Sequence, residues 1–266
     1  MIPKYLYKYR NWDDPKHKRM LTHNEIFFAS SKNFNDPSDT SVPLRFDQGT
    51  DQQMQQLLKD HISSNYGMQI DPKFETRLTE LVQELAKYNS KFIDGFEADL
   101  QEKKFNQYGF FTMSSLCNNT LLWSNYADNH RGFCAKFDTD ILNSCFQKYA
   151  NAKQLIDIRE VEYESEFPVL NVFEMSYEEI VVRQVSVKAA DWSYEKEFRA
   201  ILYKSTNLLY KLVPEVLIEV IIGVRMSKQS RSEIISVLKN RIPRVNLLQA
   251  KLKKGAFGLD FERIDY

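Results

Sequence analysis

Short β-prone runs recur along the whole chain, and this pattern limits the possible folds more than any other sequence feature. The first two runs, residues 5–10 and 25–30, are rich in aromatic or aliphatic residues. Further strands are predicted at residues 108–113, 132–137, 161–163, 195–203, 216–224 and 245–251. Helices are predicted at residues 17–21, 51–66, 73–106, 120–128, 175–187 and 230–241. We therefore expect a single α+β domain over residues 1–266, with a mixed β-sheet core and a helical insert near residues 50–106.

Composition indicates a folded protein without a membrane span. The 266 residues are 43% hydrophobic and 13% aromatic, and no apolar run reaches the roughly 18 residues that a spanning helix needs. The first residues lack the apolar core of a signal peptide. Three cysteines without metal-ligand spacing and four scattered histidines predict no metal site. The expected location is a reducing cytoplasm.

The charges balance overall but are unevenly distributed. Lys plus Arg and Asp plus Glu total 36 each, so no strong net attraction to nucleic acid is expected. Residues 225–254, however, contain nine basic side chains and one acidic one, Glu233. Two interpretations stay open for this stretch: a face for a phosphate-bearing ligand or nucleic acid, or the solvated side of surface elements.

The segment Trp192–Arg199 gives the clearest indication of chemistry. It leads into a predicted strand, where side chains alternate between faces. Glu195, Glu197 and Arg199 are therefore expected on one face, near Trp192 and Tyr194. Two carboxylates and a guanidinium beside aromatic rings form a plausible polar ligand site. The alternative is a solvated strand edge with ion pairs, which contribute little to stability when exposed.

Two groups in the first forty residues are candidate ligand contacts. Lys8 and Arg10 alternate with tyrosines on the first predicted strand, and a guanidinium binds phosphate through two parallel hydrogen bonds. An exposed strand edge explains both cations nearly as well. In the second group, Ser30 and Ser31 end the next strand and offer hydroxyls to a ribose or an amide.

Two further motifs each have a structural and a functional interpretation. The sequence Phe34-Asn35-Asp36-Pro37 is typical of a turn, and Asn35 and Asp36 would alternatively shape a pocket. Trp123 and Tyr126 share one face of a predicted short helix. That spacing is usual for core packing, and a stacking platform for a ligand is the functional alternative.

Taken together, these motifs resemble one bacterial family, the domain of unknown function 2971. The resemblance covers residues 5 to about 225 and brings no established activity. It is carried, in order, by the segments 7–10, 28–31, 34–37, 122–127, 132–133 and 192–199.

The order of elements also resembles an ADP-ribosyltransferase fold, with Arg10 early, Ser30 and Ser31 after the second strand, and Glu195-Lys196-Glu197 late. This resemblance implies that NAD is the substrate. Glu197 would stabilise the oxocarbenium-like charge that develops when nicotinamide leaves, and Glu195 would orient or activate the acceptor. Arg10 would hold the pyrophosphate.

The remaining candidate contacts to this nucleotide are predicted to be Lys8, Ser30, Ser31, Asn35, Asp36, Trp123, Tyr126, Trp192 and Arg199. The expected activity is ADP-ribose transfer to a nucleic acid or protein, or NAD cleavage, as in a toxin or a phage-defence effector. Two other classes stay open. A metal-dependent nuclease would use the carboxylates with Lys188 and the basic C-terminal third. A non-catalytic module would bind a nucleotide or a protein. The sequence leaves the oligomeric state open.

Overall fold

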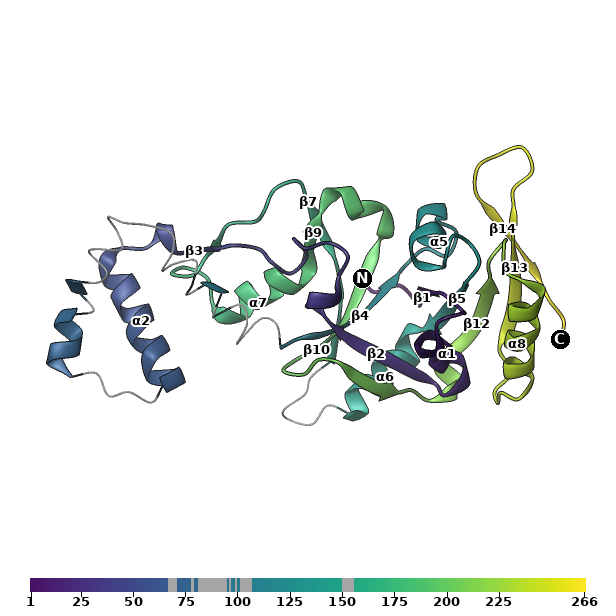
Figure 1. The fold of residues 1–266 in the computed structure, drawn as a ribbon, viewed down its shortest axis with the longest axis horizontal. Coiled ribbons are helices and arrows are strands. Elements are labelled where there is room, and N and C mark those ends of the chain that lie inside the picture. Colours follow the sequence, from purple (N-terminus) through teal and green to yellow (C-terminus); the bar gives the residue numbers. More distant parts are fainter. Residues whose placement is uncertain are drawn as a thin grey trace. The chain divides into compact units, whose positions relative to one another are not determined.

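The computed structural model describes residues 1–66, 71–77, 79–80, 95, 97–98, 100, 107–149 and 156–266 (Figure 1). The chain divides into two compact units. The first contains Met1–Pro37, Gln107–Ser165 and Ser186–Tyr266, and the second contains Ser38–Asn106 and Glu166–Val185.

In the described part of the first unit, ten strands form one mixed sheet. The principal order is β11-β2-β4-β1-β5-β12-β13-β14, while β10 pairs with β4 and with β6. All pairs are antiparallel except β12 with β13. The strands are β1 (Tyr5–Arg10), β2 (Glu25–Ser30), β4 (Gly109–Ser114), β5 (Phe133–Asp138), β6 (Ile156–Glu160), β10 (Glu197–Leu202), β11 (Leu208–Lys211), β12 (Leu217–Ile222), β13 (Asn246–Leu252) and β14 (Leu259–Arg263).

Strand alternation gives this sheet two apolar faces. On one face Leu6, Phe133 and Val220 join a large core, whereas the intervening Tyr9 and Ile221 face a smaller core on the other side. The helices of this unit are α1 (Pro15–Thr22), α5 (Thr120–Tyr126), α6 (Thr139–Tyr149) and α8 (Lys228–Lys239). A two-stranded parallel sheet of β7 (Glu162–Glu164) and β9 (Val187–Ala189) completes it, with the 3₁₀ helices η1 (Ser31–Asn33), η4 (Ala190–Glu195) and η5 (Pro214–Val216).

The second unit contains α2 (Asp51–Tyr66), α7 (Tyr177–Ser186), η2 (Phe46–Gln48) and the parallel pair β3 (Leu44–Arg45) and β8 (Leu170–Asn171). The buried Gln184 amide bonds both backbone groups of Val42, which ties α7 to the segment before β3. Helical structure is also described at residues 72–77. Much of the predicted helix at residues 73–106 lies outside the described residues.

The α+β prediction is confirmed, and β1 and β2 match the predicted strands residue for residue. One prediction at the centre of the site is wrong: the strand begins at Glu197, because η4 ends at Glu195 and Lys196 takes a left-handed conformation with φ 45°. The sequence also failed to indicate α6, β11 and β14. Within the described ranges, no helix is long and apolar enough to cross a membrane.

Candidate functional site

Two glutamates and one lysine form the centre of a buried polar cluster in the first unit. Lys188 on β9 donates to Glu195 Oε2 at 2.6 Å and to Glu197 Oε2 at 2.9 Å. Glu195 and Glu197 are each 4% exposed. The left-handed Lys196 between them reverses the chain locally, so both carboxylates reach the same ammonium group although only Glu197 belongs to a strand.

Arg199 completes this cluster from the same face of β10 as Glu197. Its Nε donates to Glu197 Oε1 at 2.8 Å, and its side chain is 0% exposed. The guanidinium carbon lies 5.4 Å from the ring centre of Phe34 and 5.9 Å from that of Phe110. The solvated strand edge considered from the sequence is therefore wrong, because these three charged side chains are buried.

The two carboxyl groups differ in protonation behaviour. Burial alone would raise the pKa of Glu197, but Arg199 and Lys188 outweigh burial and lower this pKa to about 2. For Glu195 the balance is opposite: burial raises its pKa, and Lys188 and Tyr126 offset only part of that rise. One carboxylate is thus held ionised while its neighbour is biased toward the protonated form. Environments that separate the pKa values of two nearby acids are a feature of acid–base sites.

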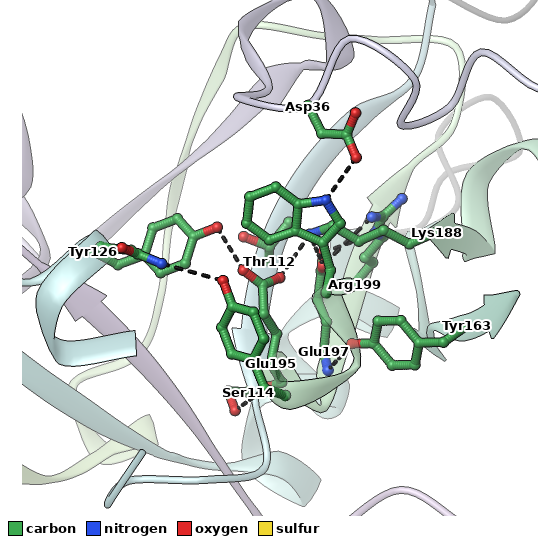
Figure 2. Close-up of polar contacts among 12 residues, drawn as sticks. Asp36, Thr112, Ser114, Tyr126, Tyr163, Lys188, Glu195, Glu197 and Arg199 are labelled. Atoms are coloured by element: carbon green, nitrogen blue, oxygen red, sulfur yellow. Dashed lines mark hydrogen bonds and ion pairs between the residues drawn. The ribbon is translucent and has the colours of Figure 1, made fainter. Parts of the chain in front are cut away.

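Half-buried aromatic side chains surround the carboxylates (Figure 2). Tyr126 at the end of α5 donates its hydroxyl to Glu195 Oε1 at 2.6 Å. On the opposite side in Figure 2, the Tyr163 hydroxyl accepts the backbone N–H of Glu197 at 2.8 Å. Trp192 donates Nε1–H to Asp36 at 2.7 Å, and its ring lies 4.9 Å from Lys188 Nζ.

A gap in the sheet lies beside this cluster. One edge of β4 pairs with β2 at Gly109 and Phe110 and with β1 only at Ser114. Lys8 fills the gap, because its ammonium donates to the Thr112 carbonyl and, at 2.8 Å, to the Thr112 hydroxyl. Burial lowers the pKa of Lys8 well below its ordinary value, and the Arg10 guanidinium lowers it further. Lys8 therefore has a structural role as well, because its hydrogen bonds to Thr112 join β1 to β4 where the two strands are not paired.

Arg10 follows Lys8 on the same face of β1. Burial lowers its pKa to about 10, so its guanidinium stays charged at neutral pH. Among the residues that the structure describes, no hydrogen bond or ion pair engages this guanidinium, and the Asp14 carboxylate at the N-cap of α1 offsets part of the fall in its pKa. Among the described residues nothing engages the N–H groups of the Arg10 guanidinium, so these groups are the donors that we assign to a ligand.

The remaining candidates divide into two groups. Asp36 reaches Trp192, and Asn35 lies beside Tyr126, where it opposes the rise in the tyrosine pKa caused by burial and Glu195. Trp123, in contrast, is 0% exposed and packs edge-on against Tyr9, so it belongs to the core.

Ser30 and Ser31 lie farther along the sheet. Ser30 pairs with Gly109 of β4. Gly109 lies five residues, or about 17 Å along the strand, from Ser114, whose hydroxyl donates to the Glu195 carbonyl. The Ser30 hydroxyl caps η1 by accepting from Lys32 N–H at 3.3 Å, and Ser31 begins that helix. The structure does not bring these two serines to the carboxylates.

Sequence reasoning missed three contributors to the cluster. Tyr163 and Thr112 carried no motif, and Lys188 was considered only for a nuclease. Tyr163 and Thr112 act through pairings between distant strands, which local sequence patterns do not specify, whereas Lys188 lies only seven and nine residues from Glu195 and Glu197. Among the described residues, no group of three or more His, Cys, Asp or Glu side chains is placed to hold a metal ion. Lys188 and Arg199 supply the positive charge beside the carboxylates.

Comparison with known proteins identifies one family. Residues 122–200 match the family described as a protein of unknown function, DUF2971. The match runs from α5 into β10 and includes Tyr126, Lys188, Glu195 and Glu197. The family resemblance found in the sequence is therefore confirmed over this segment. No curated protein and no solved structure matches the chain.

Proposed function

We propose that this chain, whose residues 122–200 match the DUF2971 family, binds NAD and cleaves the bond between nicotinamide and ribose. ADP-ribose is then transferred to a macromolecule or released by water. The observation that carries this proposal is the pair of buried carboxyl groups with opposite pKa shifts, Glu195 and Glu197, beside aromatic side chains.

Glu197 has the properties required to stabilise a developing positive charge. When the glycosidic bond breaks, its electron pair leaves with nicotinamide, and the ribose carbon becomes oxocarbenium-like. A carboxylate that is ionised and fixed before the reaction needs no reorganisation at that moment. The low pKa of Glu197 and its contacts with Arg199 and Lys188 supply both conditions.

Glu195 is suited to receive the proton of the acceptor. The acceptor hydroxyl or water forms a bond to the ribose carbon and gives up one proton in that step. A carboxylate whose pKa is raised is a better base than an ordinary one. Tyr126, which donates to Glu195 Oε1 at 2.6 Å, fixes the orientation of this group.

Two further side chains are assigned to the rest of the dinucleotide, and Arg10 is the one that lies beside Phe133 on the large-core face of β1. Its guanidinium, which no described residue engages by a hydrogen bond or ion pair, is suited to the pyrophosphate. Trp192 presents a half-buried indole suited to stacking on nicotinamide. Because Glu195 and Glu197 are each 4% exposed, substrate entry requires Trp192 or Tyr126 to move aside. Movement of Trp192 breaks its hydrogen bond to Asp36, and movement of Tyr126 breaks its hydrogen bond to Glu195.

Nicotinamide release from NAD tests this proposal. Wild type is compared with Glu197→Gln, which keeps the shape of the side chain, and with Glu219→Gln as the control. Glu219 is a strand glutamate paired with Lys136 at 3.5 Å outside the cluster. We expect Glu197→Gln to lose at least about 100-fold in rate and Glu219→Gln to keep wild-type activity. Equal turnover by wild type and a folded Glu197→Gln variant would refute the assignment.

One observation favours a second function, a non-catalytic nucleotide-binding or protein-binding module. Lys188 and Arg199 together match the charge of Glu195 and Glu197, as a structural ion cluster does. In that case Glu195 and Glu197 substitutions change stability or ligand affinity, while wild type shows no nicotinamide release. The same assay, combined with a binding measurement, therefore separates the two functions.

A further inference from the structure

Topology gathers basic residues at one end of the sheet, away from the carboxylates. β12 and β13 are parallel neighbours connected by α8, so the residues after each strand and the start of α8 lie at the same end of the sheet (Figure 1). We call the five basic residues placed there, all exposed, the basic sheet end. They are Arg225, Lys228, Arg231, Lys253 and Lys254.

Three acidic side chains nearby are engaged by other cations. Glu233 of α8 pairs with Lys18, Glu262 of β14 with Lys251, and Asp128 with Arg131. Within the ranges that the structure describes, the five cations of the basic sheet end make no ion pair. Asp260, the cross-strand neighbour of Lys251, lies on the hairpin formed by β13 and β14. Uncompensated positive charge of this kind attracts polyanions.

An exposed aromatic ring lies beside these cations. The β13–β14 hairpin presents Phe257 at 105% exposure and Leu252 at 67%. The loop is closed by the Lys253 N–H donating to the Gly258 carbonyl at 3.1 Å, and both Gly255 and Gly258 take positive φ. Phe257 is therefore held in solvent by an ordered turn next to Lys253 and Lys254.

We infer that the basic sheet end and Phe257 bind single-stranded nucleic acid. Its phosphates would contact the cations, and an unpaired base would stack on the Phe257 ring, since cationic grooves with stacking rings bind single strands without sequence preference. A membrane surface fits less well, because interfacial anchors bury a continuous apolar face and this hairpin offers only Leu252 and Phe257. The inference does not depend on the proposed NAD chemistry.

The test measures binding of a fluorescein-labelled 12-nucleotide single strand, as DNA and as RNA, by anisotropy without NAD. One variant is Lys253→Ala/Lys254→Ala, with Lys148→Ala/Lys211→Ala as the control, since both control lysines are exposed elsewhere. The other is Phe257→Ala, with Phe167→Ala as the control for an exposed ring at another site. All four replace exposed side chains, so folding is expected to be retained. Double-stranded nucleic acid and anionic phosphatidylserine vesicles serve as competing ligands.

We expect the single strand to bind, and the logarithm of its association constant to fall with the logarithm of salt concentration with a slope of up to about −3.5. Lys253→Ala/Lys254→Ala should make this slope shallower by about 1.4. Phe257→Ala should weaken binding about 5-fold or more without changing this slope. The controls should match wild type. Absence of binding, binding to vesicles alone, or equal affinity for duplex with no effect of Phe257→Ala would overturn the inference.

Discussion

Arg199 donates Nε–H to the Glu197 carboxylate at 2.8 Å, and neither side chain reaches solvent to a significant extent. The two residues are neighbours on one face of β10, with rings from Phe34 and Phe110 around the guanidinium. Charges removed from water in this way are costly unless each has its partner. The pair therefore couples the stability of the sheet to the charge state of the proposed catalytic carboxylate.

Replacing Arg199 by Met should destabilise the fold by about 3–5 kcal/mol, because Glu197 keeps its burial and loses its nearest partner. The matched control is Arg19→Met, which breaks the more exposed ion pair between Arg19 and Glu25 and should cost about 1 kcal/mol or less. Urea unfolding followed by circular dichroism measures both. Similar midpoints for the two variants would contradict the structural role of the buried pair.

Stability should also fall with acid in a way that depends on Glu197. Its pKa is about 2 in the folded chain and 4.5 ordinarily, so its contribution is complete above pH 4.5 and is lost as pH falls toward 2. The effect is measured in a Glu195→Gln background, because the raised pKa of Glu195 acts in the opposite direction. Between pH 5 and 2, the protein that retains Glu197 should lose about 3 kcal/mol more than the protein that also carries Glu197→Gln. Parallel pH curves would show that Glu197 has an ordinary pKa.

Tyr126→Phe should raise the pKa of Glu195 further. The Tyr126 hydroxyl donates to Glu195 Oε1 and favours the ionised form, so its removal favours the protonated form. Carbon-13 NMR titration of the glutamate carboxyl groups measures the shift. Tyr203→Phe, which removes a half-buried hydroxyl elsewhere in the unit, is the control and should leave Glu195 unchanged. A Glu195 pKa that is unaffected by Tyr126→Phe would contradict the described hydrogen bond.

Gly132→Ala should strongly destabilise the fold. An added Cβ at Gly132 would lie 2.1 Å from the Arg10 carbonyl oxygen, a backbone atom that cannot rotate away. The close approach brings the start of β5 beside the end of β1, so the substitution must separate the two strands. Gly95→Ala is the control, because no atom of the described residues, apart from its chain neighbours and its own helix backbone, lies within 4 Å of the added carbon. Thermal melting should show a large loss for the first variant and little change for the second, and equal melting temperatures would contradict this strand register.

The sequence predicted the parts of the fold that depend on local patterns. β1 and β2 were predicted to the residue, because each is a compact run of aromatic and aliphatic side chains bounded by turns. The shared position of Glu195 and Glu197 was also anticipated, although for the wrong reason. A continuous strand was assumed, whereas the left-handed Lys196 produces the same convergence. A non-glycine residue at positive φ has little signal in a single sequence.

What the sequence could not predict depends on contacts between distant segments. Tyr163 reaches Glu197 because β7 pairs with β9, and Lys8 reaches Thr112 because β1 leaves the edge of β4. Neither residue spacing nor composition encodes these pairings. The burial of the charged cluster was likewise hidden, since Glu-Lys-Glu-Phe-Arg is equally typical of a solvated strand.

Binding of NAD, measured by isothermal titration calorimetry, is the most direct test of the proposed function. We expect saturable heat with wild type at NAD concentrations within the usual range of enzyme substrates, about 1 μM to 1 mM. Arg10→Met should weaken that binding, because it removes the guanidinium assigned to the pyrophosphate. No saturable heat from folded wild-type protein at about 1 mM NAD would contradict the account.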